Sequence, residues 1–579
     1  MNRMAKNILK GSVAVLLLTL GTTACVHNLD VTPIDPNYKV INDDASLSSL
    51  FNKCYATLAM AGNSDGDGDV DVDGIDGGTS GFVRQLWNSN ELTTDEAICA
   101  WGDEGIPGFN FNNYDGSHPM LRGLYYRLYT AITFCNQYLY MAADIQADPV
   151  KVAEIRFLRA MEYYLALDAF GGRIPLIKAF DTSGASAPRG RINENGYEGY
   201  EVYDFIESEL LDIEDKLAAP RVAAEGQDGY GRVDQATCWA LLSRLYLNSE
   251  VYTGTARWSD AKTYAEKVIG SPYHLFKDAT TNGYTAYERL FMGNNGSNGA
   301  QVESLFSIIQ DGATTTSWGC TLFLIASMHD ANLTTWGTSE AWGGNRARPD
   351  LVDKFFPGKD APLGKGPKDM QTAAADDRAL FASGNYVPKT KKDENGVDKP
   401  VKDENGNIVY EWVEGRTYEI EKVGTFINGF AVTKWNNLYS DGGRSHDSQF
   451  VDTDFFMFRV AEAYLTYAEA DARLNGGRAT QDGLEKLNEV RRRAHASDLP
   501  AADLRTICDE WSREFYCEAR RRSDLIRFGY YGGNTSYTWA YKGSADVAEG
   551  TSFPAYRNIF AIPTTDVVAN KNLIQNEGY

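Results

Sequence analysis

The chain has 579 residues, of which 43% are hydrophobic and 23% charged, so it has the composition of a globular protein and not of a largely disordered one. Acidic residues outnumber basic ones by 79 to 56, and the resulting net charge of −23 argues against nucleic acid and anionic membrane surfaces as partners. With only 6 histidines, the chain has little material for a histidine-based metal centre.

The first 24 residues have the pattern of a secretory signal peptide. Arg3 and Lys6 precede a short apolar run at 13–18, and small residues precede Cys25. That run is too short for a membrane span, and no later segment has the length and apolarity of one. The sequence Thr-Ala-Cys25 resembles the lipobox of bacterial lipoproteins, whose cysteine is lipidated and becomes the mature N-terminus. We therefore expect a signal peptide over 1–24 and lipidation at Cys25; an ordinary secretory signal with a chance cysteine is the alternative.

Periodic apolar residues then predict a series of helices. Over 151–170, Val152, Ile155, Leu158 and Met161 recur at three-residue steps, which places them on one helix face, and two glycines and a proline follow as a stop. Similar patterns predict helices over 201–217, 234–248, 260–269 (capped by Ser259), 456–474, 483–494 and 503–528.

The spacing of these helices is similar to that of tetratricopeptide repeats, in which pairs of helices stack side by side. The segments 50–120 and 273–450 interrupt the helices with sequence of little period that is rich in Gly, Asp, Asn and Trp. We expect one mostly α-helical domain over 25–579, in which the repeats support these two excursions as an irregular lobe. Asp-Glu-Asn-Gly occurs at 393–396 and again at 403–406, and Asn-Gly favours tight turns, so two small exposed hairpins are predicted there.

Cysteines and arginines show no metal-binding or catalytic pattern. No two cysteines form a CxxC pair. If Cys25 carries lipid, seven remain, and because an odd number cannot all pair internally we expect mostly buried thiols. Arginine runs at 491–493 and 520–522 fall in predicted helices, where solvated faces or ion pairs with the many acids are expected.

No recognised catalytic motif is present, which favours binding over turnover. A glycosidase's pair of carboxylates leaves no spacing signature in a sequence, so a surface glycosidase remains an alternative. The stretch 65–76 resembles the start of a calcium loop, but Ser80 stands where a bidentate carboxylate is needed. A flexible acidic loop that edges a ligand site is the favoured interpretation.

Several tryptophans fall in the excursions and not in the periodic helices. For any one of them, burial in the core is the more common outcome. Trp101, Trp318 and Trp342 each stand beside glycine, however, and so have few neighbours to cover them. Exposed aromatic faces stack on the apolar faces of sugar rings. Others in the excursions are Trp87, Trp336 and Trp435.

Motifs spread along the chain resemble the SusD/RagB family of Bacteroidetes surface lipoproteins. They are the Leu-Asp-Val-Thr-Pro-Ile-Asp-Pro sequence at 29–36, Ala-Glu-Ile-Arg-Phe-Leu-Arg-Ala at 153–160, Ala-Glu-Ala-Tyr-Leu at 461–465, the stretch 513–529, and the ending at 562–563 and 576–579. The resemblance covers essentially the whole mature chain. It implies a mostly helical fold with four tetratricopeptide-like helix pairs beneath a loop-rich lobe, and anchorage at the outer-membrane surface.

Segments 73–96 and 337–342 are similar to those of starch-binding members of the family. The resemblance implies an arc of three aromatic side chains with a few polar contacts beside it. Starch-binding members have a tyrosine where this chain has Trp318, which keeps a stacking face and loses a hydroxyl group; a one-residue gap falls beside Asp103. The implied glycan-binding residues are Trp101, Trp318, Trp342, Asp76, Arg84 and Asp103.

The resemblance implies a binding protein, not an enzyme, that captures starch or maltooligosaccharides and passes them to a SusC-like, TonB-dependent outer-membrane barrel. A curved set of stacking faces suits a curved α-1,4-glucan. The alternatives are the same role for a fructan, another glucan or a host glycan, a surface glycosidase, and a peptide-binding scaffold. Calcium is a doubtful cofactor: Asp452 and Asp454 match an acidic pair of the family, but the loop 293–299 lacks carboxylates to partner them.

Overall fold

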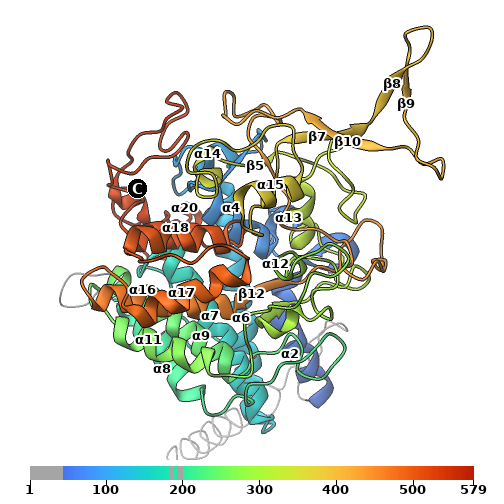
Figure 1. The fold of residues 1–579 in the computed structure, drawn as a ribbon. Helices are drawn as coiled ribbons and strands as arrows, with labels where there is room; N and C mark the ends of the chain where they lie inside the picture. The colour runs from blue at the N-terminus through green and yellow to red at the C-terminus, as the bar shows by residue number, and fades with distance from the viewer. Residues whose placement is uncertain (1–42, 182–186, 192–199) are drawn as a thin grey trace, which may run out of the picture.

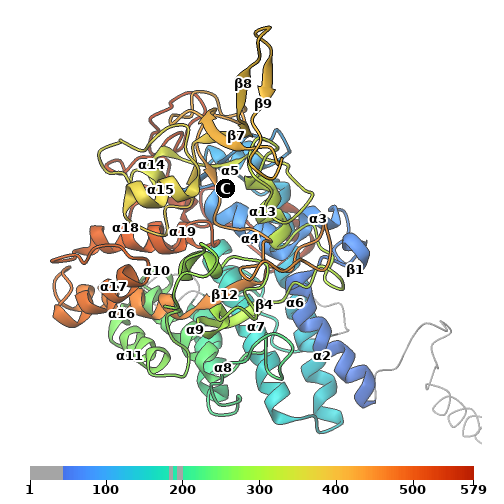
Figure 2. The ribbon, with the colours of Figure 1, turned by 45° about the vertical axis from the view of Figure 1, so that its right-hand side comes forward.

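The computed structural model describes residues 43–181, 187–191 and 200–579. The predicted signal peptide over 1–24 and the predicted lipidation site at Cys25 lie outside these residues. In the described part most regular structure is helical, and the strands form six two-stranded sheets. Figures 1 and 2 show the long helices packed together in the lower half of the molecule, with short elements and long loops above them. The expected mostly helical scaffold is confirmed.

The helices have the following bounds. The longer ones are α2 (Asp44–Ala59), α4 (Phe82–Glu91), α6 (Pro119–Asp144), α7 (Pro149–Phe170), α8 (Tyr200–Ile213), α9 (Gln235–Leu247), α11 (Trp258–Ile269), α16 (Val460–Leu474), α17 (Gln481–Arg493) and α18 (Leu504–Phe515). The shorter ones are α3 (Gly77–Ser80), α5 (Ile106–Asn110), α10 (Ser249–Thr253), α12 (Ala286–Arg289), α13 (Thr321–Met328), α14 (Pro349–Val352), α15 (Pro367–Ala374), α19 (Arg521–Arg527) and α20 (Thr564–Ala569), with 3-10 turns η1 (Asp65–Asp67), η2 (Ala300–Val302) and η3 (Ala555–Asn558).

All strand pairs are antiparallel. They are β1 (Gly62–Ser64) with β2 (Gly68–Val70), β3 (Ala97–Cys99) with β5 (Asn345–Ala347), β4 (Ser304–Ile308) with β12 (Phe455–Arg459), β6 (Phe381–Ala382) with β11 (Ala431–Val432), β7 (Gly384–Pro388) with β10 (Tyr410–Glu414), and β8 (Thr390–Lys392) with β9 (Asp398–Pro400).

The scaffold is a continuous stack of helices. α6 packs on α7, α7 on α8, α9 on α11, α11 on α16, and α16 on α17. The helix predicted over 151–170 is α7, which Asp148 caps by accepting a hydrogen bond from the Val150 N–H at 2.9 Å and which ends at Gly171, where φ is 72°. A capping box between Asp234 and Thr237 starts α9, one residue after its predicted start.

Several predicted helix boundaries are wrong. Helix α8 ends at Ile213, before the predicted end at 217. Helix α11 begins at Trp258, and Arg257, not Ser259, is its N-cap residue. Residues 455–459 form β12 and not the start of a helix. All five are buried, so this segment lacks the solvent-facing side that an amphipathic helix has. The helix predicted over 503–528 divides into α18 and α19, because Cys517 and Ala519 take positive φ angles of 60° and 62°. That break brings the Glu518 carboxylate to the buried Arg459 and Lys434.

The first excursion is more regular than expected, because α2, α4 and the start of α6 lie within or beside 50–120. The predicted exposed hairpins are confirmed. β8 and β9 flank the turn at Gly396, and a bridge between Lys402 and Ile408 closes the turn at Gly406. Together with β7 and β10 they form an arm, residues 384–414, which stands out from the body in both views (Figures 1 and 2).

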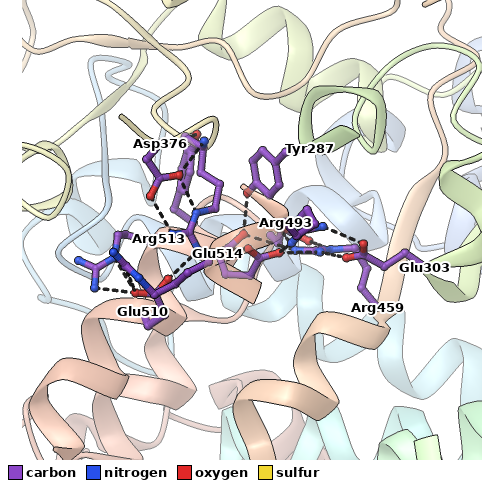
Figure 3. A network of polar contacts seen from close by, with 12 residues as sticks. Tyr287, Glu303, Asp376, Arg459, Arg493, Glu510, Arg513 and Glu514 are labelled. Carbon is purple, nitrogen blue, oxygen red and sulfur yellow. Dashed lines mark hydrogen bonds and ion pairs between the residues drawn. The ribbon is translucent and has the colours of Figure 1, made fainter. Parts of the chain in front are cut away.

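A buried ion network joins the helical scaffold to the loop-rich second lobe, which the excursions 50–120 and 273–450 form (Figure 3). Arg459, on β12, donates to Glu303 at 2.7 Å and to Glu514 at 3.0 Å. Arg493, the last residue of α17, also donates to Glu303 at 2.7 Å, and all four side chains are fully buried. The prediction of ion pairs for the arginine runs is therefore confirmed at Arg493, which is buried. Arg492 lies at the surface of α17 and pairs with exposed acids.

The cysteines fit the prediction of buried thiols. Every cysteine in the described residues is a buried free thiol: Cys54, Cys99, Cys135, Cys238, Cys320, Cys508 and Cys517. Within 43–181, 187–191 and 200–579, no helix is both long and apolar enough to cross a membrane.

Candidate functional site

All six residues implied as glycan contacts line one open hollow of about 560 Å³ on the second lobe. The hollow is lined by Trp101, Trp318, Trp342, Asp76, Arg84 and Asp103, together with Gly66, Asp67, Val70, Gly77 and Gly78. Its walls come from the β1–η1–β2 hairpin, from α3 with its N-cap Asp76, from the start of α4, from the loop after β3, and from the loops on either side of α13. Segments more than 200 residues apart in the sequence therefore meet here.

Two of the aromatic rings form a bent surface. The ring centroids of Trp318 and Trp342 are 6.2 Å apart, and the ring planes make an angle of 36°. Phe450 packs edge-on against Trp318 at 5.0 Å and supports it. Trp101 packs edge-on against Phe323 at 6.2 Å. All three tryptophans are partly exposed, so each has ring surface to offer a ligand.

Asp67 fixes the backbone of Trp318 from across the sequence. Its carboxylate accepts hydrogen bonds from the Trp318 N–H at 2.8 Å, from the Ser317 hydroxyl at 3.0 Å and from the Ala61 N–H at 2.9 Å. Asp67 is buried, with 4% of its surface exposed. Because a charged group accepts strong hydrogen bonds, this arrangement holds the tryptophan loop against the hairpin before any ligand arrives.

Glu340 orients Trp342. Its carboxylate accepts a hydrogen bond from the Trp342 indole N–H at 2.7 Å, and its other oxygen accepts one from Gln449 at 2.8 Å. The Trp342 backbone N–H donates to the carbonyl of Ala326 at the end of α13. The indole N–H is thus satisfied by the protein, and the ring faces are what Trp342 presents to the hollow.

Arg84, on α4, lies between the aromatic and acidic parts of the hollow. Its guanidinium is 5.9 Å from the Trp101 ring and 5.0 Å from the Phe323 ring. Burial lowers the pKa of Arg84, while Asp103 and Asp76 oppose that shift. Its Nη1 donates to the Gly78 carbonyl at 3.3 Å, and its Nε has no hydrogen-bond partner within the described chain.

Asp76 and Asp103 are exposed at the rim. Asp76 caps α3 by accepting a hydrogen bond from the Thr79 N–H at 2.9 Å. Carboxylates and a guanidinium beside flat aromatic faces match the mixed surface of a sugar, which is apolar on its ring faces and polar at its edges.

Glycines let the backbone approach these rings closely. A β-carbon at Gly78 would lie 2.7 Å from Cβ of Trp318, and one at Gly81 would lie 2.6 Å from Cα of Gly319. A β-carbon at Gly344, where φ is +108°, would overlap the indole of Trp101. Residues with side chains at these positions would displace the rings.

The acidic stretch 65–76 edges the hollow, as the sequence suggested, but much of it is an ordered hairpin and not a flexible loop. Asp71, one of the acids that resemble a calcium loop, pairs instead with Arg127 at 2.6 Å and Lys53 at 3.2 Å. The Asp71 carboxylate is therefore balanced by two cationic side chains of the protein.

Asp452 and Asp454 also have partners within the protein. Asp452 accepts hydrogen bonds from Tyr439 and from His446. Asp454 accepts from Tyr230 and from the Gln310 N–H, and burial raises its pKa to about 8. Both carboxylates thus have partners within the protein, and among the described residues no group of three or more His, Cys, Asp or Glu side chains is placed to hold a metal. The expectation that calcium is a doubtful cofactor stays a prediction.

The other tryptophans named from the sequence lie outside the hollow. Trp87 and Trp435 are buried in the core, and Trp336 packs edge-on against His329. The sequence analysis missed Asp67, Glu340 and Phe450, whose roles depend on contacts between distant segments and leave no local signal. It also passed over Trp412 on the arm, although that residue falls in the second excursion.

Comparison with known proteins supports the sequence resemblance. The family model described as "SusD family" matches residues 303–579. The starch-binding protein SusD of Bacteroides thetaiotaomicron is 36% identical over 573 residues, which is 98% of this chain and 97% of that protein. The chain belongs to the SusD family.

Solved structures show the same fold. A SusD homolog from Bacteroides thetaiotaomicron is 19% identical, with a TM-score of 0.64 over 94% of this chain and 98% of its own. Surface glycan-binding protein A from Bacteroides fluxus is also 19% identical, with a TM-score of 0.62 over 93% of this chain and 100% of its own. Of these relatives, SusD and the Bacteroides fluxus protein are named for binding and none for catalysis, in agreement with the expectation of a binding protein.

Proposed function

We propose that this SusD-family chain captures starch or maltooligosaccharides at the cell surface by stacking glucose rings on Trp101, Trp318 and Trp342. The observation that carries the proposal is the meeting of these rings with Asp76, Arg84 and Asp103 in one hollow. The similarity to a starch-binding protein over nearly the whole chain supports it.

The shape of the aromatic surface favours α-1,4-glucan over flat polymers. A ligand that lies on both Trp318 and Trp342 must follow the 36° angle between their planes. An α-1,4-glucan chain curves in this way, whereas a β-1,4-glucan chain is extended and flat. The selection would therefore depend on the conformation of the polymer and on the polar groups at the rim.

Affinity electrophoresis of the lipid-free protein tests the ligand. Gels that contain amylopectin or pullulan are expected to retard it, and gels that contain dextran or levan are not. Trp342→Ala is expected to weaken retention by amylopectin at least about tenfold, because a stacking face is lost. Trp239→Ala is a matched control: Trp239 is also partly exposed and hydrogen-bonded to a glutamate, Glu214, but it lies on α9 of the scaffold.

The outcomes separate the alternatives. No retardation by amylopectin would refute starch as the ligand and direct the search to other glycans or to peptides. Release of reducing sugar from starch by the purified protein would favour a surface glycosidase. Equal effects of Trp342→Ala and Trp239→Ala would refute the assignment of the hollow.

We further propose that the chain is lipid-anchored at Cys25 to the outer membrane and passes its ligand to a SusC-like, TonB-dependent barrel. Cys25→Ser is expected to move the protein from the membrane fraction to the soluble fraction. A tagged wild-type chain, purified from detergent-solubilised outer membranes, is expected to bring such a barrel with it; its absence would contradict the partnership.

A further inference from the structure

The arm carries a row of aromatic side chains on one face of its ribbon. In the pairing of β7 with β10, Tyr386 lies opposite Trp412 and Pro388 opposite Tyr410. Because side chains alternate along a strand, these four residues share one face. The Tyr386 ring is 5.2 Å from that of Tyr410, nearly parallel at 17°, and 5.1 Å from that of Trp412.

This row is only partly covered: Trp412 lies against Gly366, Tyr386 and Tyr410 stack on each other, and the rest of the row faces outward. In the described chain, β7 and β10 pair only with each other, and the arm extends away from the body (Figures 1 and 2). Tyr410 is 44% exposed, and Tyr386 and Trp412 are only partly buried. Single exposed aromatics are ordinary, but a contiguous row of them marks an interaction surface.

The base of the arm adjoins the loop that carries Trp342. The Tyr386 N–H donates to the Asn332 carbonyl at 2.7 Å. Trp412 packs against a small cluster that includes Leu333. The segment before Trp342 therefore holds the base of the aromatic row.

The exposed ring of Phe426 lies between the hollow and the arm. Arg416, two residues beyond β10, pairs with Asp330 and donates to the Phe426 carbonyl at 3.1 Å. A β-carbon at Gly343, next to Trp342, would lie 3.2 Å from Cβ of Asp330 and 3.3 Å from the Phe426 ring. Phe426 is 40% exposed. Exposed aromatic surface thus continues from the hollow toward the base of the arm.

We propose that Tyr386, Tyr410 and Trp412 form a second carbohydrate-stacking surface, which binds glucose rings of the same polysaccharide chain beyond the hollow. The inference rests on the proposed function and extends it from oligosaccharide to polymer. Aromatic faces bind the apolar faces of pyranose rings, and the continuity with Trp342 favours a glycan chain as the occupant. Two linked contacts on one polymer raise the apparent affinity, whereas a short oligosaccharide fills the hollow alone.

The test compares a polymer with a short ligand. The double variant Tyr386→Ala/Tyr410→Ala is expected to bind amylopectin about 5- to 20-fold more weakly in affinity gels. It is expected to bind maltoheptaose as the wild type does in calorimetry. Val413→Ala is the control: Val413 is exposed on the same strand, and strand alternation places it on the opposite face. An unchanged melting temperature of the double variant shows that the arm's loss of rings has not unfolded the body.

The failures of the two proposals differ. If the wild type is retained by amylopectin and the double variant is retained equally, the second surface is refuted and the hollow stands. If the double variant keeps polymer retention but no longer copurifies with a membrane barrel, the row binds a protein and the glycan assignment is wrong. If the wild type binds neither amylopectin nor maltoheptaose, both proposals fall.

Discussion

Glu514→Gln removes one charge from the centre of the buried ion network in Figure 3. The Glu514 carboxylate pairs with Arg459 at 3.0 Å, with Arg378 at 3.4 Å and with Arg493. These three guanidinium groups are fully buried, so they cannot turn to water for compensation. Glutamine keeps the shape of the side chain but leaves the three buried arginines with one carboxylate fewer to balance their charge.

The size of the loss follows from the pKa of Glu514. Neighbouring arginines hold that pKa at about 2, below its ordinary value of 4.5, despite the opposing effect of burial. At about 1.4 kcal/mol for each pH unit, the ionised carboxylate contributes about 3 kcal/mol to stability at pH 7. Removal of one partner from a buried ion pair costs about 3–5 kcal/mol, which agrees. With an unfolding entropy of about 1.2 kcal/mol/K for 579 residues, the melting temperature is expected to fall by about 3 °C.

The pH dependence has a defined sign. A carboxylate with a depressed folded-state pKa stabilises the protein above the unfolded-state value, and that contribution is lost as the pH falls from about 4.5 toward 2. Because glutamine resembles the protonated carboxyl, the difference between wild type and variant is expected to shrink from about 3 kcal/mol at pH 7 to about 1.5 kcal/mol at pH 3.

Denaturant unfolding with a shared slope, together with calorimetric melting, measures this difference. Glu485→Gln is the control, since Glu485 pairs with Arg492 at the surface and both side chains are nearly half exposed. No measurable change in stability is expected for it. Equal melting temperatures for Glu514→Gln and Glu485→Gln, or a difference that does not vary with pH, would refute the reasoning.

Three further outcomes are expected. Glu340→Ala leaves the Trp342 indole without its acceptor, so binding of maltoheptaose should weaken about 3- to 10-fold in calorimetry, with little change in melting temperature. Gly344→Ala should displace Trp101 and cost about 1–3 kcal/mol in stability, and a fully stable variant with normal binding would contradict the close contact. Burial raises the pKa of Asp454 from its ordinary 3.8 to about 8, so the folded state holds this proton more tightly than the unfolded state. The free energy of unfolding is therefore expected to fall as the pH rises from about 4 to 8. Asp454→Asn should remove this trend. In unfolding experiments between pH 5 and 8, the free energy of unfolding of the variant should rise relative to that of the wild type by about 1.4 kcal/mol per pH unit.

Helices with an apolar face and local caps could be predicted from the sequence. Helix α7 has both, and its boundaries agree with the prediction to within two residues at the start and exactly at Phe170. Helix α4 was missed because its apolar stripe is short: Phe82, Val83, Leu86 and Trp87 recur at four-residue steps, and the next turn buries Asn90 and Glu91 instead. The break between α18 and α19 occurs without glycine or proline, and Glu518 at the break pairs with Arg459 and Lys434, which are distant in the sequence.

The candidate site could be predicted as a set of residue types but not as a geometry. Tryptophans beside glycine pointed to exposed rings, and the family resemblance selected three of them. The angle between Trp318 and Trp342 depends on supports such as Phe450 and Glu340, which lie more than 100 residues away or give no pattern of their own. The burial of Asp67 could not be predicted either, because in the sequence it is one of many acids in a polar stretch.

The close contacts at Gly78, Gly81 and Gly319 set the path of the backbone that carries the ring at position 318. Substitutions at position 318 and substitutions at the three glycines therefore have different effects. A codon change from Trp318 to tyrosine or phenylalanine leaves the position of the ring unaltered and alters what it can bind. A codon change at any of the three glycines moves the ring itself. Descendants of this gene can thus vary in the ring at position 318 while they retain the same three glycines.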